Sequence, residues 1–260
     1  MKKTDIHLHL TFEQHPKTEH MFVSSAEHML PHLRELSIEK GILMSSGEGN
    51  SAVPFGSNDE CRQIAEAFPG IYFWMCNLDD VPENIFERLE TYKNQGAVGI
   101  GELMINRSID DPMIQEIFAA AETLSLPVLF HMSPEVGYEY GIVDDAGLPL
   151  LEESLKKYPN LKFIGHSQPF WHEISGDASG DLSSRMEWGK GEVVPGGRLS
   201  YLFDTYPNLY GDLSANSGGC AIMRDETFGL SFLEKYCDRL MFATDMVNVD
   251  MEFPLGKWLE

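Results

Sequence analysis

The stretch TDIHLHL, residues 4–10, forms the first predicted β-strand and contains two histidines separated by a single leucine. Side chains alternate between the two faces of a strand, so Asp5, His7 and His9 are expected on one face. Two imidazoles side by side suit a divalent cation, although an isolated pair of this kind is also common among surface histidines. The stretch therefore predicts a strand whose polar face carries candidate metal ligands.

Seven further β-rich runs follow, and the segments between them show helical periodicity, as in DPMIQEIFAAAETLS from Asp111. Each interval is long enough for one strand-helix-strand unit. Eight such strands in one chain favour a closed (β/α)8 TIM barrel over an open doubly wound sheet. The runs are IEKGILMSS from Ile38, IYFWMCNL from Ile71, AVGIGELMI from Ala97, PVLFHM from Pro127, LKFIGHS from Leu161, NLYGDLSA from Asn208 and RLMFATDM from Arg239.

The predicted barrel spans residues 1–260 as a single domain of the α/β class, because no linker or low-complexity tract divides the 260-residue chain. The longest interruption, about residues 168–195, follows the sixth predicted strand and is rich in Gly and Ser. Loops on this face of a barrel build active sites. We therefore expect this segment to form either a lid over the mouth or a solvated insertion.

Charge and composition restrict the partners and the location. The chain has 19 Lys and Arg against 41 Asp and Glu, a formal net charge of −22, which opposes binding to nucleic acid and to anionic membrane surfaces. No run has the length of a membrane span or the form of a secretory signal, and the four cysteines form no C-x-x-C pair. We expect a cytoplasmic protein with a small-molecule substrate and no nucleic-acid or membrane partner. Assembly into a homo-oligomer is compatible with the sequence.

Four other predicted strands also end in residues of metal-binding type. In a barrel, the carboxyl ends of all strands converge on one mouth, whatever their separation in sequence. A carboxylate beside apolar runs is costly to bury unless a cation or hydrogen bonds compensate its charge. Six residues are therefore predicted to form one metal site, namely His7, His9, Glu102, His131, His166 and Asp245.

This set, in this strand order, resembles the amidohydrolase superfamily of metal-dependent hydrolases, and the resemblance covers nearly the whole chain. The motifs TDIHLHL, FIGHSQPFW and RLMFATD are similar to the amidohydrolase-related branch that includes decarboxylases of the aminocarboxymuconate-semialdehyde type. The run GIGELMI followed by LPVLFH resembles instead the TatD-type metal-dependent deoxyribonucleases. These branches differ in chemistry, so the resemblance implies the fold and a metal but not one reaction.

The resemblance implies one or two divalent ions, with zinc first and manganese, iron or nickel as alternatives. The superfamily often has a carboxylated lysine on the fourth strand, where this chain offers only Glu102. A mononuclear site is the alternative, with His166 oriented toward the substrate and with His7, His9, His131 and Asp245 as ligands. The binuclear assignment implied by the resemblance is His7, His9 and Asp245 on one ion, His131 and His166 on the other, and Glu102 as the bridge.

A bound divalent ion lowers the pKa of water from 15.7 to about 7 and polarises the bond under attack. Asp245 is the candidate general base, and His166 is the second candidate catalytic residue. The leading hypothesis is hydrolysis of a small-molecule ester, lactone, amide or related bond. A mononuclear decarboxylase is the alternative. A TatD-type nuclease ranks third because of the negative charge of the chain, and the last hypothesis is a barrel that binds metal or ligand without catalysis.

Three residues near the expected mouth are candidate substrate contacts. Arg224 follows the seventh predicted strand and is suited either to clamp a substrate carboxylate or to pair with Asp225 or Glu226. Gln168 and Trp171 follow the sixth strand in GHSQPFW and are expected either to line the pocket or to pack.

Overall fold

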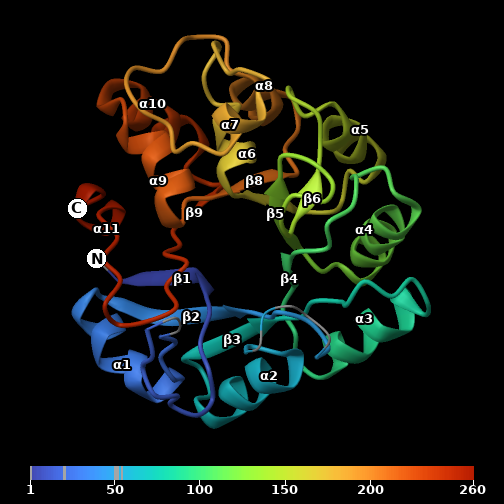
Figure 1. Ribbon diagram of the computed structural model, residues 1–260, viewed down its shortest axis with the longest axis vertical. Helices are drawn as coiled ribbons and strands as arrows, with labels where there is room; N and C mark the ends of the chain where they lie inside the picture. Colours follow the sequence, from blue (N-terminus) through green and yellow to red (C-terminus); the bar gives the residue numbers. More distant parts are fainter. Residues whose placement is uncertain (1, 20–21, 50–52, 54) are drawn as a thin grey trace.

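The computed structural model describes residues 2–19, 22–49, 53 and 55–260, and shows a ring of strands surrounded by helices (Figure 1). Eight of the strands begin within a few residues of the predicted starts, and the two-residue β6 was not predicted. The strands are β1 (Lys3–Leu8), β2 (Ile38–Met44), β3 (Tyr72–Met75), β4 (Ile100–Leu103), β5 (Val128–Ser133), β6 (Ile142–Val143), β7 (Phe163–His166), β8 (Leu209–Asp212) and β9 (Leu240–Met241).

The helices occupy the outside of the ring (Figure 1). Several begin at a polar cap residue; for example, the Asp111 carboxylate accepts a hydrogen bond from Met113 N, one residue after Pro112 has started the helix. The helices are α1 (Ala26–Glu35), α2 (Asn58–Ala67), α3 (Ile85–Asn94), α4 (Pro112–Leu124), α5 (Pro149–Lys157), α6 (Gln168–His172), α7 (Leu182–Arg185), α8 (Arg198–Thr205), α9 (Ala215–Met223), α10 (Glu226–Tyr236) and α11 (Leu255–Trp258).

Parallel pairing closes the strands into a barrel. The order β1-β2-β3 and the order β4-β5-β7-β8-β9 are continuous ladders, with β6 paired to β5 alone. Cys76 bridges to Ile100 between β3 and β4, and Leu8 bridges to Met246 where the chain after β9 meets β1. The amide of Asp245 also donates to His7 O at 2.9 Å across this seam. The predicted (β/α)8 TIM barrel is therefore confirmed.

The barrel interior is filled by side chains and forms a core separate from the one under the helices. Met44, Met75, Leu129 and Ile164 pack together inside the ring. A Cβ atom on Gly101 would lie 2.9 Å from the Met44 sulfur, so a glycine in β4 leaves the space that this methionine occupies. This plug of apolar side chains supports the residues at the carboxyl ends of the strands.

The segment 168–195 is attached to the barrel rather than projecting as a separate loop. It contains α6 and α7, and Arg185 at the end of α7 is only 4% exposed. Its guanidinium donates to Pro134 O, directly after β5, and to Asp144 O, directly after β6, both at 2.9 Å. A buried arginine with these two partners ties the segment to the loop after β5.

Among the described residues, no helix combines the length and the apolar character that crossing a bilayer requires.

Candidate active site

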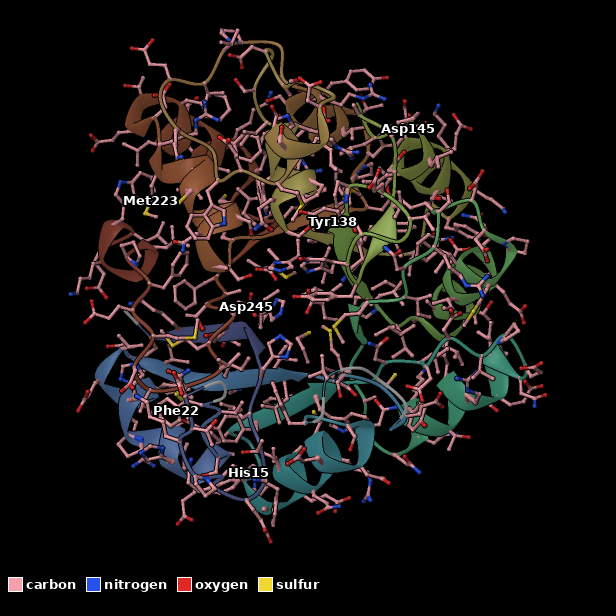
Figure 2. The ribbon with its side chains drawn as sticks, in the orientation of Figure 1. His15, Phe22, Tyr138, Asp145, Met223 and Asp245 are labelled. Atoms are coloured by element: carbon pink, nitrogen blue, oxygen red, sulfur yellow. The ribbon has the colours of Figure 1, made fainter. Side chains whose placement is uncertain are left out.

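Three predicted residues meet at the seam between β1 and the chain after β9. The Nε2 atoms of His7 and His9 lie 3.0 Å apart. The Asp245 carboxylate lies 3.4 Å from the first and 3.2 Å from the second. His7 is fully buried, whereas the Asp245 side chain is 26% exposed. Figure 2 shows Asp245 inside the ring beside β1, with Tyr138 on the β5 side.

Glu102, at the end of β4, lies between two pairs of histidines. Its Oε2 is 3.7 Å from Nε2 of His7 and 3.6 Å from Nε2 of His9. Its Oε1 is 2.6 Å from Nδ1 of His131 and 3.5 Å from Nε2 of His166. Each carboxylate oxygen of one buried side chain thus faces a different histidine pair. All six predicted residues lie in a single cluster at the carboxyl end of the barrel.

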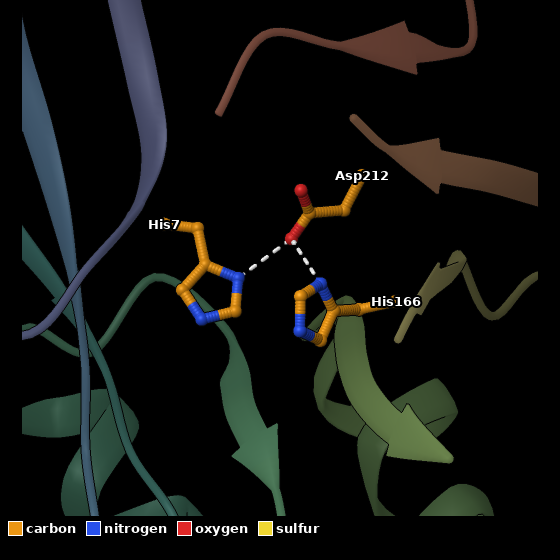
Figure 3. A group of neighbouring side chains, drawn as sticks. All are labelled: His7, His166 and Asp212. Carbon is orange, nitrogen blue, oxygen red and sulfur yellow. Dashed lines mark hydrogen bonds and ion pairs between the residues drawn. The ribbon is translucent and has the colours of Figure 1, made fainter. Parts of the chain in front are cut away.

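Asp212, which the sequence analysis missed, belongs to the same cluster. It ends β8 and is fully buried, and its Oδ2 lies 2.6 Å from Nδ1 of His7 and 3.5 Å from Nδ1 of His166 (Figure 3). Ser214 Oγ lies 2.9 Å from the same His166 nitrogen. The sequence signal was present, because the run NLYGD ends in a residue of metal-binding type, as the other ligand-bearing strands do.

Asp5 does not join the cluster, contrary to the strict alternation expected for β1. The pairing of β1 with β2 shifts register between Asp5 and Leu8, which breaks the alternation. The Asp5 carboxylate instead accepts hydrogen bonds from His7 N at 3.0 Å, Thr244 N at 3.1 Å and Thr244 Oγ1 at 2.6 Å. It therefore connects β1 to the residue that precedes Asp245.

Opposite charges dominate the electrostatics of the cluster. Burial alone would raise the pKa of the Asp212 carboxyl, but the imidazoles of His7 and His166 outweigh burial and lower it. The same balance lowers the pKa of Glu102, with His131 as the main opposing partner. Burial alone would lower the pKa of His7, and the neighbouring carboxylates raise it well above its ordinary value. The carboxylates of the cluster are thus held in their negatively charged form, which favours binding of a cation.

The chemistry of these donors fits a divalent cation. Imidazole nitrogen and carboxylate oxygen are ligands for zinc, manganese, iron and nickel. Asp212 can only accept a hydrogen bond, so it holds the proton of His7 on Nδ1 and leaves Nε2 free to coordinate. Among the described residues, three groups each have donor atoms within 4.8 Å of one another, and these are His7, His166 and Asp212; His7, His9 and Asp245; and Glu102, His131 and His166.

The candidate substrate contacts lie outside this cluster. Trp171 is 2% exposed and packs in the core, where its Nε1 donates to Asp212 O at 2.9 Å, so it packs rather than lines a pocket. Arg224 donates to Gly191 O at 2.8 Å and to Glu192 O at 2.9 Å, which ties it to the long segment. Gln168 is the first residue of α6 and is half-buried.

An aromatic side chain covers one of the candidate ligands. The Tyr140 ring, in the loop between β5 and β6, has its centroid 4.5 Å from that of the His131 ring. Burial and the charges of Glu102 and Asp245 raise the pKa of the Tyr140 hydroxyl. The loop after β5 therefore contributes directly to the surroundings of the cluster.

The sequence profile of the amidohydrolase family matches residues 5–260. No relative was found among curated protein sequences. The fold is similar to that of an uncharacterised TIM-barrel protein from Bordetella bronchiseptica, with 16% identity, a TM-score of 0.65, and coverage of 100% of this chain and 90% of that one.

Two named enzymes also share the fold. A probable 2-pyrone-4,6-dicarboxylic acid hydrolase from Acinetobacter baumannii, solved with citric acid, has 12% identity, a TM-score of 0.62 and coverage of 100% and 92%. A dihydroxybenzoic acid decarboxylase from a Polaromonas species, solved with manganese and the inhibitor 2-nitroresorcinol, has 16% identity, a TM-score of 0.55 and coverage of 98% and 90%. The match over nearly the whole length decides the assignment: the chain belongs to the amidohydrolase family of metal-dependent enzymes.

Proposed function

We propose that the protein hydrolyses an ester, lactone, amide or related bond in a small molecule, using two divalent ions bridged by Glu102. The observation that carries this proposal is the position of Glu102. Its two oxygens face different histidine pairs, His7 with His9 and His131 with His166. A carboxylate between two ligand sets is suited to bridge two ions. Zinc is the proposed metal, and manganese, iron or nickel would suit the same donors.

The proton transfers of hydrolysis are assigned to Asp245. When bound, the ions lower the pKa of the attacking water and polarise the bond under attack. Asp245 is the most exposed of the carboxylates in the cluster, so it faces the side from which water and substrate arrive. Its charged form is favoured because His7 and His9 outweigh the effect of burial on its pKa. An ionised carboxylate at this position can accept a proton from water and return it to the leaving group.

His166 is the second proposed catalytic residue. Ser214 and Asp212 hold its Nδ1, so its Nε2 is directed toward the cluster, 3.5 Å from Glu102 and 3.8 Å from Asp245. In the binuclear assignment this nitrogen is a ligand. In a mononuclear assignment it would contact the substrate.

Decarboxylation with one bound ion is the second candidate. His7, His9 and Asp245 form a compact donor group by themselves, which favours a single ion at the seam. The fold shared with the manganese-containing decarboxylase is compatible with this reaction. Nuclease activity is disfavoured because a chain with a net charge of −22 repels nucleic acid. We therefore propose a small-molecule substrate.

The proposal is tested by comparing metal-free and zinc-loaded protein on matched panels of esters, lactones, amides and aromatic carboxylic acids. Hydrolysis that requires metal and is lost in Asp245→Asn supports the proposed function. Release of carbon dioxide without any hydrolysis would replace it with the lyase. Asp250→Asn is the control, because Asp250 is exposed and forms an ion pair with the surface residue Lys17.

A further inference from the structure

A cavity of about 520 Å³ lies beside the metal-ligand cluster. Its walls come from the loops after β2, β3, β4 and β5 at the carboxyl end of the barrel. Tyr140 lines the cavity and its ring lies against that of His131 with an interplanar angle of 53°, while Asn77 lines the cavity and donates to Glu102 O at 2.6 Å. A molecule held in this cavity therefore contacts residues that touch two of the candidate ligands.

The wall that carries Tyr140 is fixed by side chains from two other parts of the barrel. Asn106, after β4, accepts from Gly137 N at 2.6 Å and donates to Gly141 O at 3.0 Å. Arg185 donates to Pro134 O and Asp144 O, which flank the segment that carries Tyr140. Gly141 has φ +109°, and a Cβ there would lie 2.8 Å from His131 O, so the loop packs closely on this ligand. Contacts from several elements therefore hold this wall in place.

The charges on the cavity wall have one sign. Asp79, Asp80 and Glu139 line it, and within the described part of the chain no lysine, arginine or histidine does. Arg107 lies next to Asp80 but is shared between that carboxylate at 2.8 Å and Asp111 at 2.9 Å. The remaining wall is apolar or neutral, with Tyr140 as its largest ring.

The arginines of the surrounding segments already have partners. Arg88 pairs with a carboxylate, and Arg224 donates to backbone carbonyls. Arg185 uses both terminal nitrogens on carbonyls, and only its buried Nε has no partner. A substrate carboxylate is bound well by a fork of two parallel N–H groups, which a single N–H does not provide. The described part of the cavity wall therefore repels a substrate carboxylate and offers it no lysine or arginine side chain.

We propose that this cavity holds the part of the substrate next to the reacting bond, that this part is uncharged or cationic rather than a carboxylate, and that Tyr140 packs against it. The inference rests on the proposed function in assigning the ligand cluster to catalysis. Glu139 repels an anionic group at the rim of the cavity, and the Tyr140 ring is the surface against which the substrate packs. Aromatic rings accept both apolar groups and cations, so both substrate types fit one wall.

The test uses binding rather than turnover, which keeps it independent of the reaction. Three hydroxamic acids share a chain of equal length that ends in methyl, trimethylammonium or carboxylate. Their dissociation constants are measured by calorimetry on zinc-loaded protein. We expect the carboxylate probe to bind at least about tenfold more weakly than the other two, because Glu139 repels it and no lysine, arginine or histidine lines the described part of the cavity wall. Equal or tighter binding of the carboxylate probe, or binding of none of the three, would overturn the proposal.

Matched variants distinguish an effect of the cavity wall from an effect of the net charge of the protein. Glu139→Lys should remove most of the discrimination against the carboxylate probe, whereas Glu135→Lys, the same charge change on the same loop outside the cavity, should retain it. Tyr140→Ala should weaken all three probes. Discrimination that is unchanged in Glu139→Lys would contradict the assignment. Probes that bind in the expected order to a protein without hydrolytic activity would contradict the proposed function alone.

Discussion

The Nδ1 atom of His7 lies 2.6 Å from Oδ2 of Asp212, so the carboxylate that ends β8 orients the first histidine of β1. The contact joins strands at opposite ends of the sequence and is fully buried on both sides. It determines which imidazole nitrogen faces the cluster. Outer carboxylates of this kind raise the basicity of a ligating histidine.

Asp212→Asn should lower zinc affinity by about 10- to 100-fold while the protein stays folded, because an amide no longer dictates the His7 tautomer. Competition with a chromophoric chelator measures the affinity. Asp238→Asn is the matched control, because its side chain is 79% exposed and remote from the cluster. Unchanged affinity in Asp212→Asn would show that the contact does not orient a ligand.

Asp245→Asn should lower kcat by about 10²- to 10⁴-fold on whichever substrate the screen identifies, because the amide cannot accept the proton of the attacking water. Metal content is measured on the same preparation. A variant that keeps its metal and its full activity would remove Asp245 from the role of general base.

Trp171→Phe should lower the free energy of unfolding by about 1 kcal/mol, since the indole donates a buried hydrogen bond to Asp212 O. KM should stay within about twofold, because Trp171 packs in the core. Trp188→Phe, at a side chain 49% exposed, should change the stability by less than about 0.5 kcal/mol. A large rise in KM with unchanged stability would return Trp171 to the substrate pocket.

Glu152 links α5 to α8, and its hydrogen bonds to Tyr206 and Arg198 lower its pKa to about 2. A carboxyl with a lower pKa in the folded state stabilises the fold above its unfolded pKa, and this stability is lost as the pH falls. Glu152→Gln should therefore lower the free energy of unfolding at pH 7 by about 1–3 kcal/mol. The difference from wild type should shrink as the pH falls from about 4.5 toward about 2.

Urea titrations at several pH values measure this effect. Glu153→Gln is the control for Glu152→Gln, because Glu153 is the next residue along and its side chain, which pairs with Lys156, is 71% exposed. A difference between wild type and Glu152→Gln that does not depend on pH would contradict the electrostatic explanation.

The strands and the six clustered residues were predictable because barrel topology brings strand ends together without any knowledge of side-chain packing. The alternation of short β-rich runs with helical segments was enough for the fold. Asp212 was predictable in the same way, since the run NLYGD also ends in a residue of metal-binding type.

Other features depend on contacts that no local pattern encodes. The shift between Asp5 and Leu8 arises from the pairing of two strands. Trp171 packs in the core because of its neighbours rather than its motif. The course of the segment 168–195 depends on Arg185 and two distant backbone carbonyls, and the partners of Arg224 lie in that same segment. Long-range hydrogen bonds to backbone atoms leave no signature in the order of residue types.

Metal content per chain shows whether Glu102 bridges two ions, because each bridged site holds a pair of ions rather than one. Wild type and Glu102→Ala are purified under metal-replete conditions and analysed for elemental content, with circular dichroism as a check on folding. We expect two equivalents in wild type and one or none in the variant. One equivalent in both proteins would contradict the bridged site and favour the mononuclear alternative.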